Sequence, residues 1–358
     1  MISPAAALLC TLASASQAQE LQTEPIAFEV EDLTLSGQLS LPASGDARAL
    51  VILVHGYGRT NVIQDNWYYD LRTQLASRGI ASFTWDKPGC GESDGEFDAD
   101  QSVQSSAREV VAAAAALREF GVPGSERIGL WGVSRAGWIA PLALDQDPKL
   151  AFWISVSGVD DKESFGYLLR SNWRIEGYSE ERASELYGQW QRGNEIVAQG
   201  GSHASYLEAT ALLRKDPFYA FVTGRTDPVT ETEYAALVKK VAALEQRIDE
   251  ATGLAIYVED FPALLSRIRV PVLAIFGEKD SIVDWRATRR LYDSTLGSKR
   301  EKSLRIATFP NGNHNLHRCE TGGYREMLGI LDAPRMVDGY FRAILEWLDD
   351  QVLATEKK

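Results

Sequence analysis

Ser134 lies in the sequence Gly132-Val133-Ser134-Arg135-Ala136, between a segment typical of a strand and a segment typical of a helix. A serine nucleophile on such a strand-to-helix turn needs small residues two positions before and after it, because the two backbones approach closely there. Gly132 meets this demand, and Ala136 replaces the commoner glycine at the cost of one methyl group. The alternative is that Ser134 only caps the helix. The pentapeptide alone leaves both interpretations open.

A carboxylate and an imidazole that could activate Ser134 follow two later apolar segments. Asp280 comes shortly after the run 271–276, and His314 follows the run 304–309 through a short turn. We predict His314 as the general base and Asp280 as the acid that orients the imidazole. Asp284 is the rival carboxylate, but it directly precedes a helical pattern and is better explained as an N-cap.

A tetrahedral intermediate at Ser134 would need two main-chain N–H groups aimed at its oxyanion. One is expected from Arg135, directly after the nucleophile, and the other from Tyr57 in the segment His55-Gly56-Tyr57-Gly58. His55 itself is interpreted as a structural histidine. The Arg135 guanidinium could bind a substrate carboxylate, although we favour a structural ion pair on its helix.

These residues must be positioned by a sheet whose strands alternate with helices. Strands are expected at 26–30, 33–41, 49–54, 80–85, 127–132, 151–156, 271–276 and 304–309. Helices are expected at 65–78, 102–120, 134–144, from 284 onward, and at 336–351. The first two strands read as an antiparallel pair. The later alternation predicts an α/β fold, a mostly parallel sheet with helices on both faces.

The alternation stops between residues 159 and 262, where the sequence is polar, helix-favouring and without a convincing strand. A segment of this length is too long for an ordinary loop and predicts a helical cap. The core would then comprise residues 26–158 and 263–355. Four aromatic residues of the cap could line an acyl pocket, but at helical spacing they are expected to pack between the cap helices and the sheet: Trp173, Tyr178, Tyr187 and Trp190.

A further motif completes a family resemblance. The stretch from Trp85 to Ser93 resembles the D-x-x-G-x-G-x-S sequence of α/β-hydrolases of the serine aminopeptidase, dienelactone hydrolase and bacterial esterase kind. The order Ser134, Asp280, His314 is also the order of the triad in that fold. The resemblance covers residues 49–156 and 271 to the C-terminus. It implies hydrolysis of carboxylic esters, thioesters or amides, with no metal or organic cofactor. Ala136 and Val133 depart from the usual pattern.

Three functions remain open at this stage. An esterase or thioesterase acting through an acyl-enzyme is favoured. An aminopeptidase or amidase of the same fold would need acidic cap residues, such as Glu176 or Glu259, to hold a free amino group. A non-catalytic binding protein on a hydrolase scaffold would be expected to carry a broken triad, which this sequence does not show.

Composition limits the partners. The chain has 358 residues and a net charge of −13, and it contains no Lys/Arg run that could neutralise phosphates, so we expect no nucleic-acid binding. Past the first segment, no apolar stretch approaches the ~20 residues of a membrane span. A small-molecule substrate is expected.

The first 18 residues resemble a cleavable signal peptide, although no Lys or Arg lies between Met1 and Glu20. We therefore expect an exported protein, periplasmic or secreted, with a cytoplasmic location as the alternative. Cys90 and Cys319 could form one disulfide in an oxidising compartment, but we favour two unpaired thiols.

Overall fold

The computed structural model describes residues 21–161, 164–224, 227, 229–243, 247–249, 254–297, 304–330 and 334–354. The predicted signal peptide, residues 1–18, lies outside the described residues. Within the described part of the chain, no helix is both long and apolar enough to cross a membrane.

An eight-stranded sheet forms the centre of the molecule, in the order β1-β2-β4-β3-β5-β6-β9-β10. Antiparallel pairing joins β1 to β2 and β2 to β4, and every later pair in that order is parallel. The α/β fold with a mostly parallel sheet is therefore confirmed. The strands are β1 (Gln22–Val30), β2 (Leu33–Leu41), β3 (Ala49–Val54), β4 (Ile80–Trp85), β5 (Ile128–Val133), β6 (Trp153–Val156), β9 (Val272–Gly277) and β10 (Leu304–Phe309).

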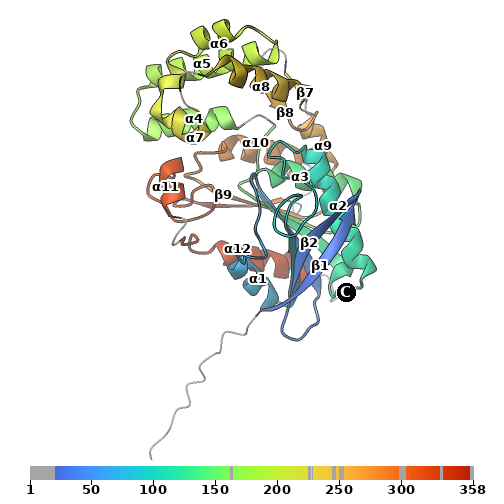
Figure 1. The fold of residues 1–358 in the computed structure, drawn as a ribbon. Coiled ribbons are helices and arrows are strands. Elements are labelled where there is room, and N and C mark those ends of the chain that lie inside the picture. The colour runs from blue at the N-terminus through green and yellow to red at the C-terminus, as the bar shows by residue number, and fades with distance from the viewer. Residues whose placement is uncertain are drawn as a thin grey trace, which may run out of the picture.

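Helices cover both faces of this sheet (Figure 1). One face packs against α2 (Val103–Glu119), α3 (Ala136–Gln146), α9 (Phe261–Arg267) and α10 (Trp285–Thr295), and the other against α1 (Tyr69–Ala76) and α12 (Tyr340–Leu348). All six residues of β3, β4 and β9 are buried, as expected for strands covered on both sides. The apolar runs of the sequence therefore form the two layers of the core.

Between β6 and β9 the chain forms a helical segment with its own apolar core, drawn above the sheet in Figure 1 and called the cap from here on. It contains α4 (Phe165–Ile175), α5 (Glu180–Ala198), α6 (His203–Ala209), α7 (Pro217–Thr223) and α8 (Glu231–Ala242), with a 3₁₀ turn at Leu213–Lys215. Trp173 is fully buried, and its Nε1 and the Tyr178 hydroxyl donate to the two carboxylate oxygens of Asp216, at 2.8 and 2.9 Å. Tyr187 stacks on Trp190. These aromatic residues therefore pack the cap helices against one another, and the expectation that they pack between the cap and the sheet is wrong.

The cap is joined to the core through α4. The Ser171 hydroxyl donates to the carbonyl of Ser281 at 2.5 Å, and the buried Asn172 amide donates to the same carbonyl and to the Ser281 hydroxyl. The Asn172 side-chain oxygen accepts from the N–H of Tyr324, at the start of α11 (Tyr324–Gly329). The cap helix therefore contacts the loops that follow β9 and β10.

Three expectations about the elements are wrong in detail. The helix expected at 336–351 begins only at Tyr340, because Arg335 and Val337 form main-chain hydrogen bonds with the loop after β10. The helix expected at 65–78 is shortened to α1 by the turns that precede it. The inserted segment, expected to lack strands, contains the two-residue pair β7 (Arg247–Ile248) and β8 (Ala255–Ile256). Pairs so short leave no alternating pattern to detect.

Candidate active site

Ser134 occupies the turn between β5 and α3 with φ of 56°, in the left-handed region that non-glycine residues rarely adopt. Its N–H donates to the carbonyl of Val156 at the end of β6, and its carbonyl accepts from Gly137. A Cβ built on Gly132 would lie 2.8 Å from the Cβ of Ala136. The strand and the helix therefore approach as closely as the nucleophile-elbow interpretation requires.

Asp280 and His314 are brought together from loops that follow neighbouring parallel strands, β9 and β10. Asp280 Oδ2 lies 2.7 Å from Nδ1 of His314, and both side chains are buried. The other carboxylate oxygen accepts from the N–H groups of Ile282 and Val283, at 2.8 and 3.0 Å. These bonds hold the carboxylate in the orientation in which it meets the imidazole.

The rival carboxylate, Asp284, has a structural task. Its Oδ1 accepts from the N–H groups of Arg286 and Ala287, which makes it the N-cap of α10.

Ser157 links the turn of Ser134 to the loop of His314. It follows Val156, whose carbonyl accepts from Ser134, and its own hydroxyl donates to the carbonyl of His314 at 2.6 Å. Ser157 also has a positive φ, 47°, and its N–H donates to Ile275 in β9. The turn of Ser134 and the loop of His314 are therefore both hydrogen-bonded to the pair Val156 and Ser157 at the end of β6.

The segment after β3 lies against Ser134. A Cβ built on Gly56 would lie 3.3 Å from the carbonyl oxygen of Val133 and 3.4 Å from the Cβ of Ser134, so the main chain of Gly56 packs directly against this turn. Tyr57, which follows Gly56, is 71% exposed.

His55 is buried, and its Nε2–H donates to the carbonyl of Trp85 at 2.6 Å. Burial, reinforced by the charge of Lys87, lowers its pKa to about 3. His55 is therefore a neutral structural histidine.

The Arg135 side chain contacts residues at the start of α2 and not, as expected, an acidic residue of its own helix, α3. Its guanidinium donates to the carbonyl of Gln101 and to the hydroxyl of Ser106, at the start of α2. The expected ion pair along its own helix is thus replaced by hydrogen bonds to the neighbouring helix, and burial lowers its pKa.

A family profile described as serine aminopeptidase, S33, matches residues 45–321, which include all of these residues. The chain belongs to this family. Its members are α/β-hydrolases of the esterase and peptidase kind, so the resemblance stated from the sequence is confirmed.

Solved structures show the same fold. An esterase of Pyrococcus furiosus, Pf2001, superposes with a TM-score of 0.53 at 13% identity, covering 92% of this chain and 90% of the esterase. Proline iminopeptidase of Mycobacterium smegmatis gives 0.50 at 18% identity, covering 93% and 100%. An acylaminoacyl peptidase of Pyrococcus horikoshii gives 0.50 at 15% identity, covering 92% of this chain and 42% of the peptidase.

One curated relative matches over a shorter segment. Polyketide transferase claH of Penicillium crustosum is 28% identical over 139 residues, which is 38% of this chain and 44% of the transferase. The match therefore spans less than half of that relative.

Two buried charged groups of this S33-family chain were not predicted from the sequence as parts of the site. Lys87 is only 8% exposed, and its Nζ donates to the carbonyls of Gly56 and Gly58, on either side of Tyr57. Glu109 accepts from the indole of Trp85 and from Gln101, and burial raises its pKa. Asp86, Gly89, Gly91 and Ser93, the signature positions of the D-x-x-G-x-G-x-S stretch, were the only sequence signal in this region.

Cys90 and Cys319 are both free and buried, so the structure has the unpaired thiols that we favoured. Burial raises the pKa of the Cys319 thiol to about 11.

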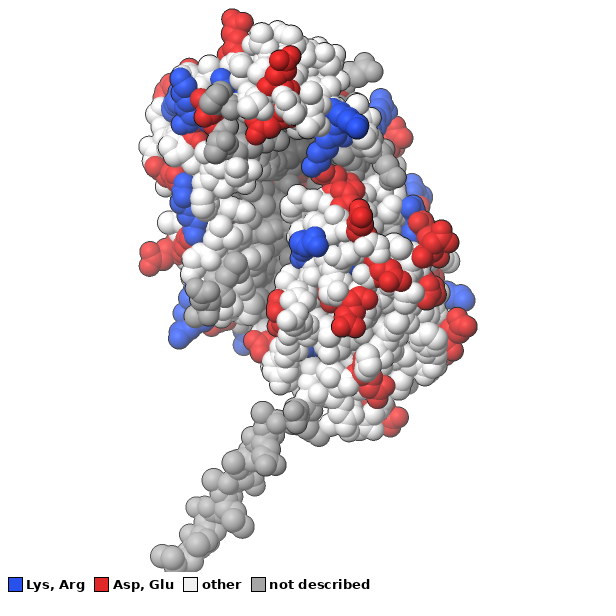
Figure 2. All heavy atoms as spheres, in the orientation of Figure 1, with Lys and Arg blue, Asp and Glu red and all other residues white. Residues whose placement is uncertain are grey.

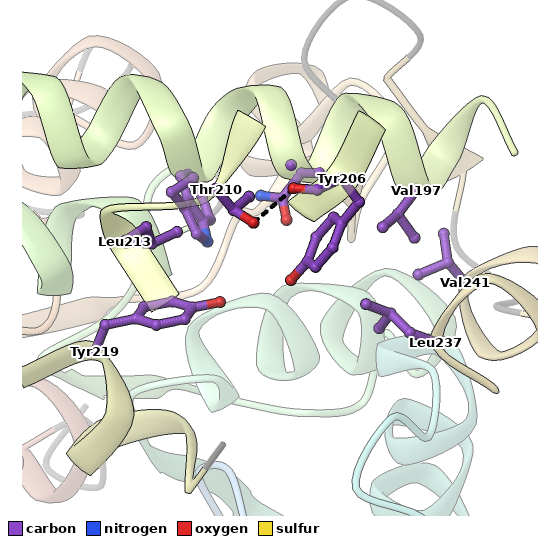
Figure 3. A pocket seen from close by; sticks show the side chains of 10 residues that line it. Val197, Tyr206, Thr210, Leu213, Tyr219, Leu237 and Val241 are labelled. Carbon is purple, nitrogen blue, oxygen red and sulfur yellow. Dashed lines mark hydrogen bonds between the residues drawn. The ribbon is translucent and has the colours of Figure 1, made fainter. Parts of the chain in front are cut away.

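A small cavity of about 80 Å³ lies inside the cap between α5, α6, α7 and α8 (Figure 3). Tyr206 and Leu237 are among its lining residues, and Thr210 donates to the carbonyl of Tyr206 there. None of its lining residues belongs to the loops of Ser134, Asp280 or His314.

Acidic and basic side chains are interspersed over the face shown in Figure 2. The excess of acidic residues is thus spread over this face and does not form a single patch.

Proposed function

We propose that the protein is a serine hydrolase that forms an acyl-enzyme at Ser134, with a small-molecule carboxylic ester or thioester as substrate. The observation that carries the proposal is the 2.7 Å contact between His314 Nδ1 and Asp280 Oδ2. It commits Nδ1 to the carboxylate, so that Nε2 is the nitrogen that can accept a proton. The positive φ of Ser134 adds the strained turn typical of a nucleophile in this fold.

The mechanism is a two-step acyl transfer. His314 takes the Ser134 proton as the oxygen attacks the substrate carbonyl, and Asp280 stabilises the imidazolium that forms. The N–H groups of Tyr57 and Arg135 donate to the oxyanion. The imidazolium then protonates the leaving group, and the same steps with water as the nucleophile release the acid and restore Ser134.

Two acidic residues of the cap form ion pairs with arginines, and these pairs favour an ester or thioester substrate over a peptide. An aminopeptidase would need free carboxylates to hold the substrate amino group. Glu176 instead pairs with Arg325 and Glu259 with Arg247, each at 2.6 Å. The aminopeptidase or amidase interpretation remains the second candidate, because the family profile itself carries the description serine aminopeptidase.

The test compares p-nitrophenyl esters of increasing acyl length with aminoacyl-p-nitroanilides, using the wild type and Ser134→Ala. We expect ester turnover that falls by several orders of magnitude in Ser134→Ala. Faster turnover of the anilides would favour the aminopeptidase. Equal, measurable rates for the wild type and Ser134→Ala would refute the assignment of Ser134 as the nucleophile, and the absence of turnover in both on every substrate would favour a non-catalytic binding protein.

A further inference from the structure

We propose that Lys87 is a positioning residue that fixes the direction of the Tyr57 N–H, and that the D-x-x-G-x-G-x-S stretch holds the oxyanion loop in this protein. The inference rests on the proposed function, since it assigns a role within the same reaction. The oxyanion loop is defined here as residues 55–60.

The ammonium group of Lys87 is bound by the main chain of the oxyanion loop. Lys87 Nζ lies 2.7 Å from the carbonyl oxygen of Gly56 and 2.8 Å from that of Gly58. A lysine side chain is rarely buried, and burying its charge costs free energy unless the ammonium finds hydrogen-bond acceptors. Two main-chain carbonyls of one short loop supply them here.

The geometry of the peptide unit couples the Gly56 carbonyl to the Tyr57 N–H. The carbonyl of Gly56 and the N–H of Tyr57 belong to one planar, trans peptide unit, so they point in opposite directions. When Lys87 holds that oxygen, it therefore also holds the N–H on the opposite side. Gly56 packs against Ser134, which places this peptide unit beside the nucleophile. A charged donor on the carbonyl also polarises the peptide unit and strengthens its N–H as a donor.

Further hydrogen bonds join the D-x-x-G-x-G-x-S stretch to the oxyanion loop and to Val62, shortly after it. The N–H of Lys87 donates to the Thr60 hydroxyl, and the N–H of Val62 donates to Asp86 Oδ1, each at 2.8 Å. Arg59 donates to the carbonyl of Gly89.

The two motif glycines have a steric reason in this arrangement. Gly89 and Gly91 have positive φ, and a Cβ on Gly91 would lie 2.3 Å from the Asp86 carboxylate. The motif thus forms a tight turn that presents Lys87 to the oxyanion loop.

The charged groups around Lys87 affect its pKa, so the pH dependence of kcat can test its role. Burial, followed by the charge of Arg135, lowers the pKa of Lys87 to about 8, and the acidic groups Glu109 and Cys90 oppose this shift. His55 also interacts with the ammonium, but its pKa of about 3 keeps it neutral above that pH. The ammonium therefore loses its charge as pH rises through about 8, while the neutral amine can still donate.

The experiment measures kcat and KM on a short p-nitrophenyl ester for the wild type, Lys87→Met and Lys87→Arg. Complete loss of one oxyanion donor costs about 10²–10³ in kcat. A donor that is present but poorly aimed should cost about ten- to hundredfold in Lys87→Met, with KM changed by less than about threefold. Lys87→Arg, which keeps a charged donor, should recover part of the rate. A trifluoromethyl ketone inhibitor, which mimics the oxyanion, should lose affinity in Lys87→Met by a factor similar to the loss in kcat.

The matched control is Arg269→Met. Arg269 lies in the segment between α9 and β9, and its guanidinium also donates to two main-chain carbonyls, those of Ser266 and Ile268. We expect a change in kcat of less than about threefold.

In the wild type, kcat should decline as pH rises through about 8, because the neutral amine polarises the Gly56 carbonyl less than the ammonium does. This decline in kcat should be absent in Lys87→Met. Wild-type kcat in the Lys87→Met variant, or an equal loss in both methionine variants, would overturn this inference. Either result would leave the proposed function intact as long as Ser134→Ala abolishes turnover; if Ser134→Ala does not, the proposed function itself fails.

Discussion

The hydroxyl of Ser157 donates a 2.6 Å hydrogen bond to the main-chain carbonyl of His314, 157 residues further along the chain. Both residues are buried. The neighbour of Ser157, Val156, accepts from the N–H of Ser134, so the end of β6 holds both the nucleophile turn and the histidine loop. This arrangement lets a small change at Ser157 test the geometry of the site without altering any group proposed to react.

Ser157→Ala should lower kcat by about ten- to hundredfold with little effect on KM, because the imidazole loses its support and a small displacement is costly at a reacting centre. The matched control is Ser155→Ala, two residues earlier, in β6. Its hydroxyl lies 3.2 Å from that of Tyr292, away from His314. Both variants should unfold at lower temperature, and only Ser157→Ala should lose activity. Equal kcat values in the two variants would contradict this role.

Asp280→Asn should reduce kcat by about 10³–10⁴ on the best ester, because an amide at this position does not stabilise the imidazolium and favours the wrong tautomer. The fold should survive, since the amide oxygen can still accept from Ile282 and Val283.

Asp284→Asn is the control for this substitution. Asn caps a helix about as well as Asp, so kcat should change by less than about twofold. An Asp284→Asn loss as large as that of Asp280→Asn would reverse the choice between the two carboxylates.

The close approach of β5 and α3 can be tested by a double-mutant cycle. Gly132→Ala should destabilise the protein by about 1–3 kcal/mol and lower kcat, because its new methyl would lie 2.8 Å from the Cβ of Ala136. The other neighbours of that methyl lie at 3.6 Å, which is ordinary contact. Ala136→Gly removes the one close atom, at a cost of up to about 1 kcal/mol. The double variant should therefore be more active than Gly132→Ala alone. Additive losses in urea-unfolding free energy and in kcat would show that the two positions are independent.

The neutral His55 should make stability depend on pH. Its pKa is about 3 in the folded protein and 6.5 ordinarily. Between these values the unfolded chain binds a proton that the folded chain does not, so the free energy of unfolding falls as pH decreases from 6.5 toward 3. The slope from this residue approaches about 1.4 kcal/mol per pH unit. Urea unfolding from pH 6.5 to 4.5 should show a smaller slope in His55→Asn than in the wild type. Identical slopes for the wild type and His55→Asn would be inconsistent with a buried neutral imidazole.

The residue types at Ser134, Asp280 and His314 could be selected from the sequence because their signals are local. Each follows an apolar run that becomes a strand, and the parallel order of β5, β6, β9 and β10 then brings their loops to one edge of the sheet. Gly132 and Ala136 carry the steric requirement of the turn in the sequence itself.

The supporting residues could not be found in this way, because their partners are set by tertiary structure. Lys87 acts on carbonyls about thirty positions earlier, and Ser157 acts on one far later in the chain. Arg135 was expected to pair along its own helix, but Gln101 and Ser106 on a neighbouring segment bind it. The closing helix was extended too far because Met336 and Val337 continue an apolar pattern while pairing with the loop after β10.

The measurement that tests the central claim most directly is covalent labelling by a fluorophosphonate probe, with the adduct located by peptide mass spectrometry. The account predicts one rapidly formed adduct on Ser134, no adduct in Ser134→Ala, and labelling slowed by about 10³-fold or more in His314→Ala. Circular dichroism and the thermal midpoint would confirm that both variants are folded. An adduct on another serine of the folded wild type, or an unchanged labelling rate in His314→Ala, would contradict the claim that His314 activates Ser134.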